Sequence, residues 1–276
     1  MGTWPSPLTP LDELAFTFVD VETTGLAPAT GDRVCEIALL RVQGDREIAR
    51  FESLVHPQRP MHPGALAVHG ITDAMLAGAP IFATLLPQIH ALFQDAVLVA
   101  HNARFDMGVL RHEWQMAGHT FPSLAVADTL ALAQARYRFR HNSLGAIASE
   151  LGVTPTALHR AMADVCTTWQ VWQRFVADMR QEGLVTLAHV LYPHSRRPVE
   201  ELTALVTTLQ EALPTGKPVQ LRYQPEKAPA TVRVVQPLEV YYERGHGYMR
   251  AFCHLRREER HFRLDRIVEL IVLHED

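Results

Sequence analysis

The sequence predicts an α/β protein of two domains, in which a mixed sheet flanked by helices precedes a small helix-plus-β-barrel domain. Strand patterns come first as a meander and then alternate with helices, which is typical of an α/β layer. Beyond Gly183 a proline- and charge-rich stretch leads to one helix and several short strands. The 276 residues also exceed what one small core covers. We therefore expect domains at 1–183 and 200–276, joined by a linker at 184–199.

The first domain opens with three strands. Alternating or continuous apolar and β-branched residues predict strands at 14–22, 33–43 and 46–56, and Gly44-Asp45 predicts a hairpin turn between the last two. The elements that follow are a helix at 80–94, a short buried strand at 96–102, a helix at 103–118, a strand and helix within 123–135, a helix at 143–153 and a long helix from about 157 to 182.

The second domain has one helix at 199–213, followed by five short strand patterns. These strands are expected at 219–224, 230–243, 247–255, 260–267 and 268–273. Short strands at this spacing indicate a small β-barrel or sandwich.

Composition and charge exclude several classes of protein. No apolar run is long enough to span a membrane, and the start MGTWPSPLTP lacks the pattern of a secretory signal. Three scattered cysteines (Cys35, Cys166, Cys253) predict a reducing, cytoplasmic setting and no thiolate metal site. Residues 1–185 hold 13 Lys and Arg against 18 Asp and Glu, which argues against bulk electrostatic wrapping of nucleic acid. A local site where bound cations reverse the sign stays compatible with this balance.

Four acids stand where strands end or helices begin. Asp20 and Glu22 lie two apart at the end of the first strand, so both project from one face. Asp106 falls in the first turn of a helix, and Asp164 lies on the long helix. Each alone has a plain structural interpretation, as a solvated strand-end acid, a helix-start acid or an exposed helix acid.

If these acids converge, they form an oxygen-rich anionic cluster suited to Mg²⁺ or Mn²⁺. Two such ions can hold the attacking and leaving oxygens of a phosphoryl displacement. The general base would then be His159, five residues before Asp164. Positions i and i+5 lie about 140° apart on a helix, so we expect His159 on a non-helical approach from which its imidazole swings toward the attacking water.

The segments FVDVETTG, HNARFD and HRAMAD resemble, in order and spacing, the three motifs of the DnaQ-like DEDDh 3′→5′ exonucleases. The resemblance covers about residues 14–182. It implies a ribonuclease-H-like fold and two-metal hydrolysis of terminal nucleotides from single-stranded nucleic acid, DNA favoured and RNA possible, releasing nucleoside 5′-monophosphates. By position it makes Asp20, Glu22, Asp106 and Asp164 the metal carboxylates and His159 the general base.

Residues beside these motifs are candidates for holding the substrate. Backbone N–H groups of the turn after the first acids could hold the terminal 3′-hydroxyl and phosphate. The resemblance implies a terminal base packed on Leu26, a nucleotide pocket along the HNARFD segment and further base contacts from VHGIT. Core or structural roles remain alternatives for several of them. The candidates are Thr23, Thr24, Gly25, Leu26, His69, Ile71, His101, Asn102 and Phe105.

The segment RYRFRH, residues 136–141, interleaves arginines with aromatic residues. Arg136, Arg138 and Arg140 could hold phosphates while Tyr137 and Phe139 stack on unpaired bases. The alternative is a solvated loop whose aromatic residues anchor it to the core. Arg104 and Arg160, next to site residues, are similar candidates for phosphate contacts.

Residues 247–270 resemble the end of a WYL domain, a small Sm/SH3-like β-barrel, and the match covers about 200–276. The chain has Gly247, Tyr248 and Met249 where the family is named for Trp-Tyr-Leu. The resemblance implies binding of nucleic acid or nucleotide-like ligands, so the module would hold the 3′ strand or gate the site. The candidate residues are Tyr223, Arg233, Tyr248, Arg250, Arg263 and Arg266.

Two other functions are compatible with the sequence. One is a nucleic-acid-binding regulator whose WYL-like module senses a ligand, against which the complete set of five catalytic residues argues. The other is a proofreading subunit that docks on a DNA polymerase or a repair partner. The fused module favours a self-sufficient enzyme, although the sequence leaves a partner open.

Overall fold

The computed structural model describes residues 5–27, 30–154 and 159–273, and its N-terminal part is built on a five-stranded mixed sheet of order β3-β2-β1-β4-β5. β1 pairs antiparallel with β2 and parallel with β4, and β5 continues parallel to β4. The strands are β1 Ala15–Thr23, β2 Val34–Gln43, β3 Arg46–Leu54, β4 Ala96–Ala100 and β5 Val126–Asp128. This confirms the predicted mixed sheet. The Gly44-Asp45 turn joins β2 to β3 as expected, with Gly44 at a φ of 58°.

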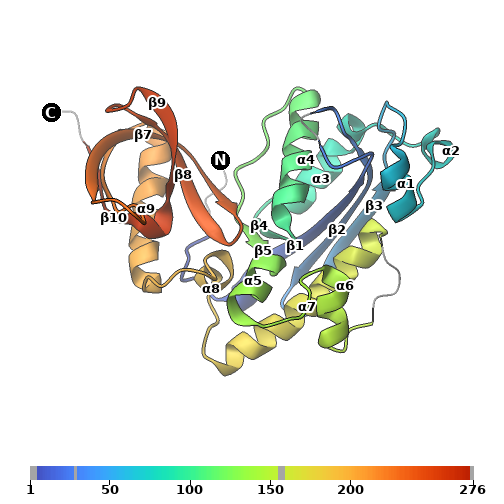
Figure 1. Ribbon diagram of the computed structural model, residues 1–276, viewed down its shortest axis with the longest axis horizontal. Coiled ribbons are helices and arrows are strands. Elements are labelled where there is room, and N and C mark those ends of the chain that lie inside the picture. The colour runs from blue at the N-terminus through green and yellow to red at the C-terminus, as the bar shows by residue number, and fades with distance from the viewer. Residues whose placement is uncertain (1–4, 28–29, 155–158, 274–276) are drawn as a thin grey trace.

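Helices cover both faces of this sheet (Figure 1). On one face α7 packs on β1 and β2, and on the other lie α3 and α4. Trp172 of α7 contacts Phe16 and Phe18 of β1, while Trp114 of α4 contacts Phe82 and Phe93 of α3. The helices are α3 Phe82–Phe93, α4 Ala103–Met116, α5 Thr129–Arg136, α6 Leu144–Glu150 and α7 Ala161–Gln181, with the shorter η1 Leu11–Glu13, α1 Pro63–His69 and α2 Asp73–Leu76. Within the described ranges, no helix is both long and apolar enough to cross a membrane.

The long helix α7 begins later than predicted. It starts at Ala161 rather than near residue 157, and Arg160 is its N-cap with extended backbone angles. The first part of the predicted helix, 157–158, lies outside the described residues. Ahead of the helix, His159 has a φ of 58°, so it is not helical, as the i+5 spacing to Asp164 predicted. At the other end Gly183, with a φ of 75°, follows the helix as expected.

The C-terminal part has one helix, α9 Val199–Thr215, and a five-stranded antiparallel sheet of order β10-β6-β7-β8-β9. The sheet curls around α9, and this is the form that the predicted small barrel takes (Figure 1). Its strands are β6 Val219–Tyr223, β7 Thr231–Glu243, β8 His246–Cys253, β9 Glu258–Arg263 and β10 Ile267–Val272, with the short η3 Leu264–Arg266 between the last two.

The predicted linker, 184–199, contains a helix that packs on the N-terminal part. This helix is α8 Leu187–Leu191, most of whose side chains are buried. The Leu187 and Ala188 N–H groups donate to the Thr9 and Pro7 carbonyls at 2.9 and 2.8 Å. This helix is therefore held against the N-terminal part, and the domain limits stay a prediction.

Candidate active site

The sheet brings together the four acids that the sequence singled out. Asp20 and Glu22 lie at the carboxyl end of β1, Asp106 in the first turn of α4 and Asp164 in the first turn of α7. The charges of Asp106, Asp164 and Glu22 all raise the pKa of Asp20, after burial as the first cause. Two residues of β1 and the first turns of two helices thus meet at the carboxyl end of this strand.

The cluster is electrostatically unfavourable without a cation. Burial is the largest cause that raises the pKa of each of the four carboxyl groups, and neighbouring carboxylates raise it further. The pKa of Glu22 rises to about 7, and the pKa values of Asp20 and Asp106 rise well above their ordinary value. A bound divalent cation would offset this repulsion, and an oxygen-rich donor set is the kind that Mg²⁺ and Mn²⁺ prefer. The residues present therefore fit such an ion.

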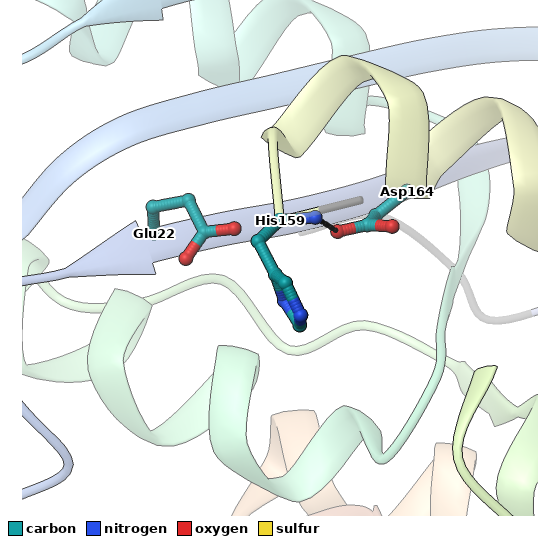
Figure 2. Close-up of side chains that lie close together, drawn as sticks. All are labelled: Glu22, His159 and Asp164. Carbon is teal, nitrogen blue, oxygen red and sulfur yellow. Dashed lines mark hydrogen bonds between the residues drawn. The ribbon is translucent and has the colours of Figure 1, made fainter. Parts of the chain in front are cut away.

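His159 completes the cluster. One ligand atom each of Glu22, His159 and Asp164 lies within 4.8 Å of the other two. Figure 2 shows the two carboxylates on either side of His159, with the exposed imidazole projecting from between them. The His159 backbone N–H donates to Asp164 Oδ2 at 3.1 Å, which ties the loop to the helix. The His159 side chain lies next to the Glu22 and Asp164 carboxylates, where a general base is needed.

The buried Glu36 is a site residue that sequence reasoning missed. It lies on β2 directly opposite Glu22 and is 7% exposed. Its carboxylate accepts hydrogen bonds from the Arg160 guanidinium and from the Ala161 N–H. An acid within the otherwise apolar run 34–40 was the available signal, since such a residue needs a buried partner.

Two further buried acids were also missed, and both hold the site's framework. Asp128 accepts from the N–H groups of Asn102 and Leu130 at 3.0 and 2.9 Å, which joins the turn before α4 to β5. Glu113 accepts two hydrogen bonds from Arg33, both at 2.8 Å, and thereby fixes the start of β2 against α4.

The turn after β1 uses most of its polar groups within the protein. The Thr23 hydroxyl donates to the Gly25 carbonyl at 2.6 Å, and the Thr24 hydroxyl donates to Asp32 Oδ1 at 3.1 Å. The Thr24 N–H donates to the Arg33 carbonyl at 2.9 Å, so a contact of this group with substrate would replace that bond and stays a prediction. Leu26 is 85% exposed, and its contact with a terminal base stays a prediction.

His69 and Ile71 are buried, which supports the structural alternative over a contact with the terminal base. His69 Nδ1 accepts from the Ile71 N–H at 3.0 Å, so Nε2 carries the proton and donates to the Thr23 carbonyl at 3.2 Å. Burial is the main cause of a lowered pKa at His69, consistent with this neutral form. His69 therefore stabilises the turn after β1 through the Thr23 carbonyl.

The HNARFD segment divides into structural and accessible residues. Both ring nitrogens of His101 have partners, Thr129 Oγ1 at 3.0 Å and the Asn142 carbonyl at 2.9 Å, so this histidine holds two loops together. Phe105 packs partly against the core. Asn102 is exposed in a left-handed conformation with a φ of 63°, and its contact with substrate stays a prediction.

The RYRFRH loop is anchored to the core, which supports the structural alternative over base stacking by its aromatic residues. Tyr137 stacks on Phe175 and Phe139 at centroid distances of 4.6 and 5.1 Å, and its hydroxyl donates to Asp178. Arg136 pairs with Glu182 at 2.6 Å, at the far end of α7. That end is about 27 Å from Asp164 at about 1.5 Å per residue, too far for a contact at the catalytic acids. Arg138 and Arg140 are exposed, and their phosphate contacts stay predictions.

The other candidate arginines, except Arg233, are paired with acids. Each phosphate contact would therefore replace an ion pair within the protein, and these contacts stay predictions. Tyr248 stacks on Tyr241 with ring centroids 5.3 Å apart, Tyr223 packs edge-on against Phe262, and the Arg233 guanidinium lies over the Phe262 ring. The pairs are Arg104–Glu243, Arg160–Glu36, Arg250–Glu239, Arg250–Glu259, Arg263–Asp265 and Arg266–Glu226.

Polymerase III proteins of several bacteria are similar to about two thirds of this chain. A DNA polymerase III subunit epsilon-like protein of Rhodobacter capsulatus is 39% identical over 188 residues, covering 66% of this chain and 27% of that protein. DNA polymerase III subunit epsilon of Treponema pallidum is 32% identical over 73% of this chain and 95% of its own length. The chain spans only 13% of DNA polymerase III PolC-type of Thermotoga maritima, with 33% identity.

Among solved structures, Exonuclease X in complex with 5′ overhanging duplex DNA covers 63% of this chain and 97% of its own, with a TM-score of 0.51 and 27% identity. Exonuclease I of E. coli in complex with a dA16 oligonucleotide covers 87% of this chain and 55% of its own, with a TM-score of 0.56 and 22% identity. These matches confirm the predicted ribonuclease-H-like fold.

Two family models match, an exonuclease family over residues 17–172 and the WYL domain family over 204–272. The first match covers every one of the five clustered catalytic candidates, and the second covers the curled sheet and most of α9. The chain therefore belongs to the exonuclease family, as a metal-dependent exonuclease that is followed by a WYL domain.

Proposed function

We propose that this exonuclease removes nucleotides one at a time from the 3′ end of single-stranded nucleic acid and releases nucleoside 5′-monophosphates. The observation that carries the proposal is the cluster of Glu22, His159 and Asp164, in which an exposed imidazole stands between two carboxylates. Asp20 and Asp106 complete the anionic set at the same sheet edge.

In this proposal Asp20, Glu22, Asp106 and Asp164 hold two divalent ions, Mg²⁺ or Mn²⁺. Bound ions supply positive charge for the attacking and leaving oxygens of the phosphodiester. His159 accepts the proton of the attacking water at an imidazole nitrogen, because it is the exposed basic side chain of the cluster. Asp164 accepts the His159 N–H, so the same helix that bears a metal carboxylate also positions the base.

DNA is the favoured substrate. The named relatives are DNA polymerase subunits, and Exonuclease I and Exonuclease X were solved with DNA. RNA stays possible, because the neighbours also include a 3′-exonuclease bound to rAMP. No 2′-hydroxyl reader is evident among the described site residues.

We further propose that the WYL domain holds the 3′ strand or gates the site. Its β7–β8 hairpin reaches α4, the helix whose first turn carries Asp106, and Glu243 pairs there with Arg104 at 2.8 Å. A nucleic-acid strand whose 3′ end is bound at the four carboxylates would therefore pass close to this hairpin.

The activity is tested by time courses on 3′- and 5′-labelled single- and double-stranded DNA and RNA, with Mg²⁺, Mn²⁺ or EDTA. We expect stepwise 3′ shortening that EDTA abolishes, and His159→Ala should lower kcat by about 10²–10⁴-fold. The matched control is His90→Ala, an exposed histidine on α3 that should leave the rate unchanged. Persistent activity in EDTA or in Asp20→Ala would contradict the mechanism.

A proofreading subunit of a DNA polymerase is a second candidate, favoured by the near-complete coverage of the Treponema pallidum epsilon subunit. A proofreading subunit binds a DNA polymerase and acts on the primer end that the polymerase holds, whereas a self-sufficient exonuclease gains nothing from a polymerase. Rates on a mismatched primer end with and without a DNA polymerase III catalytic subunit therefore separate the two functions.

A further inference from the structure

An ion pair between β2 and the start of α7 lies directly behind the proposed base. Glu36, on β2, accepts hydrogen bonds from Arg160 Nε at 3.1 Å and from Arg160 Nη2 at 2.5 Å. The same carboxylate accepts the Ala161 N–H at 2.9 Å. We call this set of contacts the Glu36–Arg160 clamp. Neither residue belongs to the metal carboxylates or is the base.

The clamp replaces the usual cap of a helix. Arg160 is the N-cap of α7 but its own side chain caps no N–H group. The N-terminal N–H groups of a helix lack partners within the helix and favour a negative charge. Glu36 supplies that charge from a neighbouring strand, so the beginning of α7 is fixed to the sheet at the residues that follow His159.

His159 has a backbone conformation that needs such support. Its φ of 58° is in the left-handed region, which residues with a side chain rarely adopt unless their surroundings determine it. The His159 N–H donates to Asp164 Oδ2. The clamp holds the residue that follows, Arg160. Contacts on both sides thus fix the backbone from which the imidazole projects.

We infer that Glu36 and Arg160 are positioning residues, which hold the His159 backbone so that its imidazole reaches the attacking water. The inference rests on the proposed role of His159 as the base. Arg160 donates three hydrogen bonds to this buried carboxylate, so its guanidinium is not free for the phosphate contact that the sequence suggested. The competing interpretation is that substrate draws Arg160 away from Glu36.

The test compares Arg160→Ala and Arg160→Lys with Arg50→Ala in the full chain. The Arg160 side chain is half exposed, so its removal should not prevent folding. Arg50 makes a similar two-bond pair with Glu47 on β3, away from the site, and serves as the matched control. The measurements are kcat, KM, Mn²⁺ binding by calorimetry and hydrogen exchange of the His159 and Ala161 amides in metal-free protein.

We expect Arg160→Ala to lower kcat by about tenfold to a hundredfold, because small misplacement of a catalytic group is costly. KM and Mn²⁺ affinity should stay within about threefold, and Arg160→Lys should recover part of the rate. Exchange of both amides should accelerate in Arg160→Ala and not in Arg50→Ala. In a His159→Ala background the Arg160 substitution should cost almost nothing more, since it acts through the base.

Two results would overturn the inference. An equal loss of rate with and without His159 would show that Arg160 does not act through the base. A raised KM with a weaker dependence on salt would show a phosphate contact instead. If His159→Ala itself keeps full activity, the proposed function fails. If His159→Ala is inactive and Arg160→Ala keeps full activity, the proposed function stands and the clamp is without a catalytic role.

Discussion

Glu22 is held in a state that a free carboxyl group does not favour at neutral pH. Its pKa rises from 4.5 to about 7, first through burial and then through the charges of Asp164 and Glu36, while Arg160 lowers it. The folded, metal-free protein therefore binds a proton that the unfolded chain releases. The acids that suit the site for cations also make it a source of instability when cations are removed.

This predicts how stability depends on pH in EDTA. A group with a raised pKa in the folded state loses its stabilising effect as the pH rises from about 4.5 to about 7, so the melting temperature should fall over that interval. Mn²⁺ should raise the melting temperature more at high pH than at low pH, because protons compete for the same oxygens.

Thermal unfolding at a series of pH values, with EDTA or Mn²⁺, measures both effects. Glu22→Gln should flatten the fall in EDTA, and the exposed Glu269→Gln should not. A melting temperature that rises over this pH interval in EDTA would contradict the prediction.

Individual residues differ in how far the sequence could assign them. The five catalytic candidates were identifiable because each stands in a motif with a fixed order along the chain. Arg160 was expected on a phosphate and instead pairs with Glu36, from which it is separated by 124 positions. A partner on a distant strand cannot be inferred from one sequence. The same holds for the buried His69, whose two ring nitrogens are hydrogen-bonded within the protein.

At the scale of elements, the turn after β1 depends on close approach of a backbone to a side chain. A Cβ at Gly25 would lie 2.4 Å from Asp32 Oδ2, which no real contact permits. Asp32 also accepts from Thr24 and Ala27 and pairs with Arg59. A methyl group at Gly25 must therefore displace a carboxylate that organises the whole turn.

We predict that Gly25→Ala shifts this turn and raises KM for oligonucleotides by about tenfold, with a smaller effect on the melting temperature. Gly78→Ala is the control, because its Cβ would have no atom within 4 Å and its φ is ordinary. Steady-state kinetics on a short oligonucleotide check the effect. Unchanged KM in Gly25→Ala would mean that the turn does not hold the substrate.

Elements with a clear apolar pattern were predictable, and several of the shortest helices were not. The strands β1 to β4 and the helices α3, α4 and α9 match the predicted ranges closely. The strands were recognisable by continuous or alternating apolar and β-branched residues, and the helices by apolar residues at the helical period. The helices α1, α2 and α8 are only 7, 4 and 5 residues long, too short to show a helical period. In the RYRFRH loop the composition suggested nucleic acid, but packing against Phe175 decided where the aromatic rings lie.

At the scale of the whole molecule, the WYL domain is packed on the exonuclease domain at the tip of the β7–β8 hairpin. The hydroxyl groups of Tyr192 and Tyr242 lie 3.0 Å apart in a buried contact. A Cβ at Gly245 would lie 2.8 Å from Ala131 Cβ on α5 and 2.9 Å from Pro193. Contacts this close fix the hairpin against α5 and the segment after α8, so the position of one domain depends on the other.

Gly245→Ala should therefore loosen the docking of the hairpin. The matched variant is Gly216→Ala, because both glycines have a positive φ (68° and 61°), but a Cβ at Gly216 would meet only ordinary contacts. The backbone strain is then similar in the two variants, and only Gly245→Ala loses the domain contact.

If the WYL domain holds the 3′ strand, Gly245→Ala should shorten the run of nucleotides removed per encounter and leave the rate on dinucleotides unchanged. Product lengths in the presence of a trap oligonucleotide measure that run. Equal runs in both variants would show that the docked hairpin does not guide the strand.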